Sequence, residues 1–147
     1  MVNTIGLNKD SLDRLRRFAA AVTHDQLRRE VGAGWTVAAL LLHVAFWDRR
    51  ASLLLARWTK SGVEDSPIDS DIVNDSVKDI LLAVPPEAAP RLALAAAEEV
   101  DRAIAGLAPS ILSEIEGRDV HVRLDRAHHR NMHLDEIEKA LGAGRQP

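Results

Sequence analysis

The sequence predicts an all-α fold, a single four-helix-bundle domain over residues 1–147 with one extra short helical segment. Three observations support this prediction. Ala, Leu, Arg and Glu are abundant whereas Tyr is absent, and apolar residues recur at helical spacing in several long segments. No segment shows the alternation of apolar and polar residues that is typical of a half-buried strand. With 147 residues, 46% of them hydrophobic, the chain is long enough to form one packed core.

Two helical segments are predicted in the first quarter of the chain. Asn8 or Ser11 can cap a first helix, whose apolar residues follow helical spacing up to Val22. The residues THDQ, at 23–26, match a capping box and predict a short second helix. The residues GAG, at 32–34, end this short helix because glycine disfavours helix continuation.

A long apolar helix and a shorter one are predicted next. Thr36 can cap the long helix, which extends to about Thr59. A polar, turn-rich loop follows at 61–71 and leads into a helix at about 70–83. This helix is expected to stop before the two prolines at 85–86.

The last third of the chain contains the two remaining helices of the predicted bundle. An alanine-rich helix starts near residue 86, or near 89 because Pro90 disfavours the earlier start, and ends at about 107. Residues 110–119 favour no single structure. The last helix is expected at about 121–141, where Gly142 ends it.

Composition narrows the class of function. The 19 Lys and Arg residues are balanced by 22 Asp and Glu residues, so no broad basic surface is expected for nucleic acid. The absence of cysteine excludes disulfides, thiolate metal sites and a cysteine nucleophile. The longest apolar stretch, VAALLLHVAF, is too short to span a bilayer, and the first residues lack the features of a signal peptide. We therefore expect a cytoplasmic protein that acts on a small molecule, without a nucleic-acid or membrane partner.

Three of the six histidines lie within HHRNMH, at residues 128–133. Each helical residue is turned by about 100° from the one before it. With Ile137 at the centre of the inward face, His133 lies ~40° and His129 ~80° from that centre, whereas His128 lies ~180° away. His129 and His133 therefore form an i, i+4 pair that can chelate one cation, and His128 is expected to face solvent.

His43 is a third candidate ligand, because it stands inside the most apolar helix on the same face as Leu40 and Trp47. A single histidine on such a face can simply be a hydrogen-bonded core residue. A buried imidazole is nevertheless costly unless its nitrogens are satisfied, and a metal shared with His129 and His133 would satisfy them. Three imidazole ligands leave one coordination position open, as in catalytic sites.

Inward-facing arginines suggest a cationic mouth of a cavity that holds a carboxylate-bearing substrate. Arg126 and Arg130 lie within ~20° of the inward centre of the last helix, and Arg50 lies near the direction of His43. Trp47, one turn from His43, is the fourth predicted substrate-binding residue. The alternatives are arginines that reach past the end of the bundle to solvent, and a tryptophan that only packs in the core.

Two stretches of this sequence resemble the DinB-like superfamily. GWTVAALLLHVAFWDRR, at 34–50, is similar to its signature helix, which starts with Trp-Ser/Thr-Val and carries a metal-binding histidine and then an aromatic–acidic pair. HRNMHLDEIEKAL, at 129–141, is similar to its closing helix with H-x-x-x-H. The intervening IDSDIVNDSVKDIL resembles the branch that contains mycothiol-dependent maleylpyruvate isomerase amino-terminal domains and ClbS-like proteins.

The resemblance implies a four-helix bundle, often a homodimer, with a divalent metal held by His43, His129 and His133. Imidazole ligation suits zinc first, and nickel, iron or copper as alternatives. Several members are thiol-dependent S-transferases or isomerases that use mycothiol, bacillithiol or glutathione, so the resemblance implies a small electrophilic substrate and a low-molecular-weight thiol. Two other functions stay open: a ClbS-like resistance hydrolase, and a non-catalytic bundle that binds a ligand or dimerises.

The sequence departs from the pattern of the superfamily at two positions. Ala39 stands where an acidic residue is common, and Arg130 where an aromatic residue is common. The second departure changes the expected cavity wall and therefore the substrate. No general base is identified, because Asp48 is turned by ~140° from His43 on an ideal helix.

Overall fold

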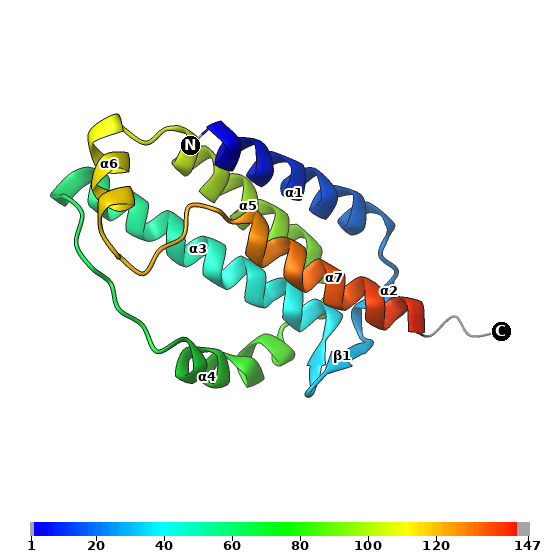
Figure 1. The fold of residues 1–147 in the computed structure, drawn as a ribbon. Helices are drawn as coiled ribbons and strands as arrows, with labels where there is room; N and C mark the ends of the chain where they lie inside the picture. The colour runs from blue at the N-terminus through cyan, green and yellow to red at the C-terminus, as the bar shows by residue number, and fades with distance from the viewer. Residues whose placement is uncertain (1, 144–147) are drawn as a thin grey trace.

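The computed structural model describes residues 2–143, and the all-α prediction is confirmed (Figure 1). The described part of the chain contains seven α-helices, one 3₁₀ helix and two very short strands. In chain order they are α1 (Val2–Ala21), α2 (His24–Leu27), β1 (Glu30–Gly32), β2 (Trp35–Thr36), α3 (Val37–Ser61), α4 (Ser70–Ala83), η1 (Pro86–Ala88), α5 (Ala89–Ala105), α6 (Pro109–Gly117) and α7 (Ala127–Ala143).

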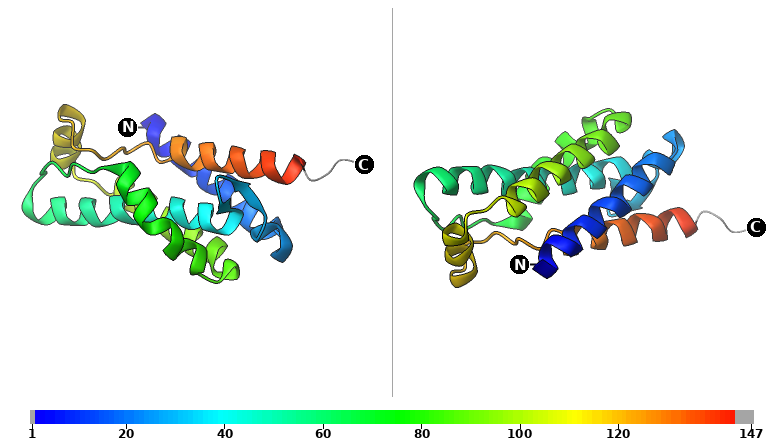
Figure 2. Two further views of the ribbon diagram at one scale, coloured as in Figure 1. Left: turned by 90° about the horizontal axis from the view of Figure 1, so that it is seen from below. Right: turned by 90° about the horizontal axis from the view of Figure 1, so that it is seen from above.

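The helices α1, α3, α5 and α7 pack alongside one another, and the other elements are attached to them (Figures 1 and 2). The most extensive packing joins α3 to α5, while α1 packs on both α5 and α7. The α4 helix lies outside this group against α3, and it contains no buried residue. The short α6 covers the end of the group opposite to the C-terminal end of α7 (Figure 1).

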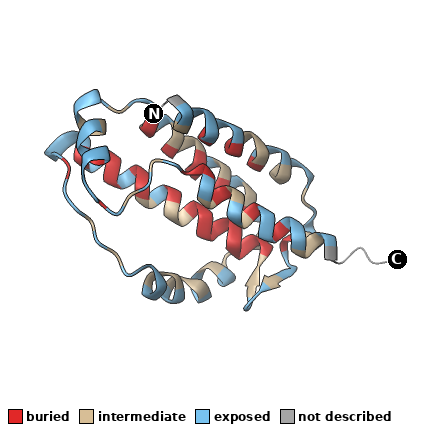
Figure 3. Ribbon diagram, viewed as in Figure 1, coloured by how far each residue is buried: buried red, intermediate tan, exposed pale blue. Residues whose placement is uncertain are grey.

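The core follows α3 from end to end, because this helix is apolar on most of its circumference (Figure 3). One cluster of buried residues surrounds its first half and includes Leu15, Leu41 and Ile137 from three different helices. A second cluster surrounds its second half, where Trp58 is 1% exposed and α6 contributes Ile115. The buried residue His43 lies in this first half of α3.

Two of the predicted caps are present. The Thr36 hydroxyl accepts a hydrogen bond from the Ala39 backbone N–H (3.1 Å), so α3 starts where its cap predicts. Thr23 and Gln26 form the capping box at the start of α2. The bounds of α4 also agree with the predicted range of 70–83.

The prediction that Asn8 or Ser11 caps the first helix is wrong, because α1 already starts at Val2 and both residues are buried inside it. Asn8 instead caps α7. Its side-chain oxygen accepts from the backbone N–H groups of Arg126 (2.9 Å) and Ala127 (3.0 Å), and its amide donates to the Leu124 carbonyl (2.9 Å). A cap supplied by a residue more than a hundred positions away leaves no local signal in the sequence.

Three other segments differ from the expectation. Residues 30–36 form a small antiparallel hairpin, whose turn has Ala33 and Gly34 at positive φ. Residues 109–117 form α6, where the sequence favoured no structure. The last helix starts at Ala127 rather than 121, because Asn8 and the Asp125 carboxylate, which accepts from the His128 N–H (3.2 Å), cap it there.

None of the helices described in residues 2–143 is by itself long and apolar enough to cross a membrane. Only α4 and the η1–α5 segment taken together have that length and composition, and they are bent by 109° relative to each other.

Candidate metal centre

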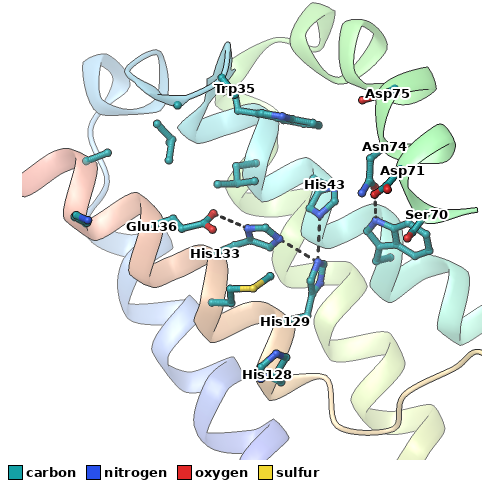
Figure 4. A pocket seen from close by; sticks show the side chains of 18 of the residues that line it. Trp35, His43, Ser70, Asp71, Asn74, Asp75, His128, His129, His133 and Glu136 are labelled. Atoms are coloured by element: carbon teal, nitrogen blue, oxygen red, sulfur yellow. Dashed lines mark hydrogen bonds and ion pairs between the residues drawn. The ribbon is translucent and has the colours of Figure 1, made fainter.

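Three histidine side chains meet between α3 and α7 (Figure 4). The His129 Nε2 atom lies 3.2 Å from the Nε2 of His43 and 3.1 Å from the Nε2 of His133. The three ligand atoms all lie within 4.8 Å of one another. The structure thus brings together the three histidines that the sequence selected.

The local sequence explains this arrangement. His43 belongs to the apolar face of α3, and packing of that face leaves the residue 6% exposed. His129 and His133 are four residues apart on α7, so their side chains project from successive turns on one side of the helix. His128 is exposed at the edge and does not join the cluster, as the facing of the helix predicted.

Hydrogen bonding alone does not satisfy the three converging nitrogens. A neutral imidazole Nε2 carries either one hydrogen or one lone pair. His129 can therefore form a good hydrogen bond to His43 or to His133, but not to both. A cation between the rings would accept one lone pair from each Nε2, which is the donor set of a three-histidine metal site.

The rings of His43 and His129 are held in the neutral form that metal binding requires. Burial lowers the pKa of His43 to about 4, and the neighbouring His133 adds to this effect. Burial also lowers the pKa of His129 to about 2, with further contributions from His133, Arg126, His43 and Arg130. Near pH 7 neither ring has to release a proton before it can bind a metal.

The Nδ1 atoms of the three rings, which face away from the point where the Nε2 atoms meet, differ in their contacts. The Nδ1 of His133 is 2.9 Å from a carboxylate oxygen of Glu136, which fixes the ring so that Nε2 faces the other histidines (Figure 4). The Nδ1 atoms of His43 and His129 are buried and have no hydrogen-bond partner among residues 2–143. His133 is therefore the ligand whose orientation is fixed from outside the cluster.

The cluster forms one wall of a cavity of about 1240 Å³ between α3, α4, α7 and the hairpin (Figure 4). Trp35 and Trp47 flank His43, with ring centroids at 5.5 Å and 6.5 Å and edge-on geometry. Each tryptophan also contacts α4. The Trp47 indole N–H donates to the side-chain amide oxygen of Asn74 (3.0 Å), and the Lys78 ammonium lies 5.5 Å from the centre of the Trp35 ring.

The four predicted substrate-binding residues do not all reach this cavity. Trp47 and Arg126 line it. The predicted position of Arg130 in the cavity wall is wrong, because its side chain is fully buried in the core. Arg50, in the middle of α3, does not line the cavity either: it donates to the Ser66 carbonyl (2.8 Å) and the His121 carbonyl (3.2 Å), and its guanidinium lies 5.8 Å from the centre of the Trp47 ring.

Arg130 belongs to a buried ion-pair network that consists of Asp48, Asp101, Arg126 and Arg130. The two oxygens of Asp48 accept from the Nε of Arg126 (2.8 Å) and the Nε of Arg130 (2.9 Å). Asp101 accepts from both terminal nitrogens of Arg130 (3.0 and 2.7 Å). Asp48 is 0% exposed and is not among the residues that line the cavity, in agreement with the sequence argument against its role as a general base.

Sequence reasoning missed three residues beside the centre: Trp35, Asn74 and Glu136. Two of them had a signal in the sequence. Glu136 follows His133 by three residues and therefore lies on the same side of α7, and Trp35 opens the stretch that resembles the signature helix of the superfamily. Asn74 reaches the cavity through the tertiary packing of α4, and no local pattern marks it.

A family model described as the mycothiol maleylpyruvate isomerase N-terminal domain matches residues 9–136. This range contains all three clustered histidines and nearly all of the helical core. No curated protein and no solved structure matches the chain.

Proposed function

Because the chain belongs to the family of mycothiol maleylpyruvate isomerase N-terminal domains, we propose that it is a metal-dependent enzyme that acts on a small electrophile with the help of a low-molecular-weight thiol. The observation that carries the proposal is the convergence of three Nε2 atoms, from His43, His129 and His133, on one point at the cavity wall. Such a set suits a divalent cation, with zinc as our first choice.

The residues present fit a bound divalent ion. Two of the rings are neutral because of burial, and the third is oriented by Glu136. Three protein ligands leave a position open toward the cavity. An ion held there would act as a Lewis acid and lower the pKa of a thiol in the cavity, so that it ionises near neutral pH.

The reactive thiol in this proposal comes from outside the protein, because the chain contains no cysteine. Mycothiol is our first candidate, since the family takes its name from it. The cavity, at about 1240 Å³, exceeds the usual volume of a site for one small ligand, which is ~300–1,000 Å³. It therefore offers room for a thiol and a second small molecule together.

In this proposal, residues that line the cavity orient the substrate. Trp35 and Trp47 form apolar walls on two sides of His43. Arg123 lines the same cavity and offers positive charge to a carboxylate of the substrate, whereas Arg126, which also lines it, is already paired with Asp48. Maleylpyruvate, named in the family description, has this chemistry and is the first substrate to test. We further propose a homodimer, which the resemblance implies, and a cytoplasmic location, which is the expectation from the sequence.

Metal analysis of the purified protein tests the centre. We expect about one equivalent of zinc or another divalent metal per chain, measured by inductively coupled plasma mass spectrometry. The double variant His43→Ala/His133→Ala should lose it, whereas His128→Ala, which alters the exposed neighbour of His129, should retain it. Wild-type protein that takes up no zinc, nickel, iron or copper would rule out the metal-dependent function and leave a non-catalytic bundle.

Turnover assays then test the role of the thiol. We expect conversion of maleylpyruvate by the metal-loaded protein only when mycothiol, bacillithiol or glutathione is added. Conversion of an electrophile at the same rate without any thiol would instead indicate a hydrolase.

A further inference from the structure

The buried ion-pair network lies next to the histidine cluster and joins the same two helices. Asp48 follows His43 by five residues on α3. Arg126, which directly precedes α7, and Arg130, within α7, stand three residues before His129 and His133 respectively. We propose that this network is a positioning device that sets the register of α7 against α3 and thereby brings His129 and His133 to His43. The inference rests on the proposed metal function, because its consequence is metal affinity.

The geometry of Arg130 makes it an anchor for α7. Besides Asp48 and Asp101, its guanidinium donates to the Asn8 carbonyl (3.3 Å), the Ser11 hydroxyl (3.2 Å) and the Ala97 carbonyl (3.3 Å). These partners lie on α1, α3 and α5, so one side chain of α7 is bonded to all three helices that surround it. The planar guanidinium fixes the direction of each bond, which a lysine could not do.

Asp48 is the residue of α3 to which the two arginines bind, and it therefore fixes their position along α3. It binds two arginines that are four residues apart, Arg126 directly before α7 and Arg130 within it, the same spacing as that of His129 and His133. A shift of α7 by one helical turn would move its side chains by about 5.4 Å and separate both the ion pairs and the histidines. Contacts between apolar residues would resist such a shift less strongly, because they have no preferred direction.

Stability alone does not account for the network. Two carboxylates and two guanidinium groups are removed from water at this position, and none of their side chains is more than 15% exposed. Replacement of such buried ion pairs by apolar residues of similar size is often neutral or stabilising. Desolvation of its charged groups is unfavourable, but the network holds its hydrogen bonds in fixed directions. It is therefore suited to setting the register of α7 against α3.

The decisive variant removes one charge of each sign from the network. In Asp48→Leu/Arg130→Met, Arg126 remains at the cavity wall and Asp101 remains partly exposed. Arg126 and Asp101 each lose their ion-pair partner in this variant, so we expect a folded protein whose urea midpoint is lower than that of the wild type. We also expect its affinity for Zn²⁺ to fall by about 10–100-fold, as for other changes outside the ligand shell. The absorption spectrum of bound Co²⁺, which reports ligand geometry, should change as well.

Two matched variants complete the test. Arg14→Met removes ion pairs between α1 and α7 at the surface, to Asp135 and Glu138, and should leave Zn²⁺ affinity unchanged. Asp48→Asn preserves the side-chain volume and lowers the affinity if the charge of Asp48 is what holds the two arginines. It takes the place of the double variant if the latter does not fold.

The contact between the rings of His43 and His129 gives a readout that needs no metal. In the metal-free wild type, nuclear Overhauser effects should join the two rings, and they should weaken in the double variant. Wild-type Zn²⁺ affinity and an unchanged ring contact in a folded variant would overturn the inference. A wild type that binds no metal would overturn the proposed function, while the ring contact would still show whether the network sets the register.

Discussion

The Nε2 atoms of His43 and His129 lie 3.2 Å apart, although 86 positions separate the two residues in the chain. The two rings belong to different helices, and within the part of the chain that the structure describes neither Nδ1 atom has a hydrogen-bond partner that would hold its ring in place. The contact therefore depends on how α7 packs against α3. Any change that moves α7 should be visible at this pair of atoms before it is visible in the rest of the fold.

The Glu136 carboxylate should contribute to metal affinity although it does not touch the metal position. Glu136→Gln weakens its bond to the His133 Nδ1–H and lowers the basicity of this ligand. We expect Zn²⁺ affinity to fall by about 10–100-fold in isothermal titration calorimetry. Glu138→Gln on the same helix, which changes an exposed carboxylate paired with Arg14, is the control and should bind Zn²⁺ as the wild type does. Equal affinity in the two variants would exclude an orienting role for Glu136.

The metal-free protein should be sensitive to mild acid. The pKa of His43 is lowered by burial from its ordinary value of 6.5 to about 4, so between these values the unfolded chain binds more protons than the folded one. His129, with a pKa of about 2, acts in the same direction. The contribution of these neutral rings to the free energy of unfolding should thus be fully present above pH 6.5 and be lost as the pH is lowered toward 4.

Urea unfolding at pH 7, 6 and 5 in the presence of a chelator measures this loss. His43→Leu removes one of the two depressed groups, so its stability should decrease less over the same range. His128→Leu changes an exposed ring and should retain the dependence of the wild type. If the free energy of unfolding of His43→Leu fell with pH as steeply as that of the wild type, this would contradict the burial of a neutral imidazole at this position.

Asn8→Ala should destabilise the protein through the start of α7. The substitution leaves the N–H groups of Arg126 and Ala127 without their acceptor in a buried location. An unsatisfied buried donor costs about 1–3 kcal/mol of unfolding free energy. Chemical denaturation gives the value, with Asn3→Ala, at an exposed position of α1, as the control that should change little. A loss no larger than that of the control would show that water replaces the cap.

His121 should titrate above its ordinary pKa of 6.5, because its Nδ1 lies 2.7 Å from a carboxylate oxygen of Asp65. NMR titration of the ring should show the raised pKa in the wild type and a lower pKa in Asp65→Asn. Glu64→Gln, the neighbouring exposed carboxylate, is the control. The contribution of this pair to stability is present below the ordinary pKa and is lost as the pH rises through the raised one. Identical curves in all three proteins would exclude the pair in solution.

The helices and the three histidines could be predicted from the sequence because both leave local signals. Thr36 caps α3 through its own neighbours, and the spacing of His129 and His133 places them on one side of a helix. His43 was recognisable because a polar ring interrupts an otherwise apolar face. Such features depend on residues within one or two turns.

The arginines could not be assigned correctly in the same way. The direction of each residue on an ideal helix predicts that Arg126 and Arg130 point inward, which the structure shows. It does not predict that Asp48 and Asp101 form ion pairs with them. Asp48 was judged only by its direction relative to His43, and its pairing partners lie about eighty positions away. The cap from Asn8 and the contacts of α4 with the two tryptophans escape local reasoning for the same reason.

The distance along the chain between the histidines also determines when the site can exist. The ribosome adds ~5–20 residues per second, so roughly 4–17 s pass between the synthesis of His43 and that of His129. During this time the growing chain has one imidazole of the proposed centre, which is too weak a ligand to retain an ion. An ion at this centre would therefore be selected only after His129 and His133 have been synthesised and α7 has packed against α3.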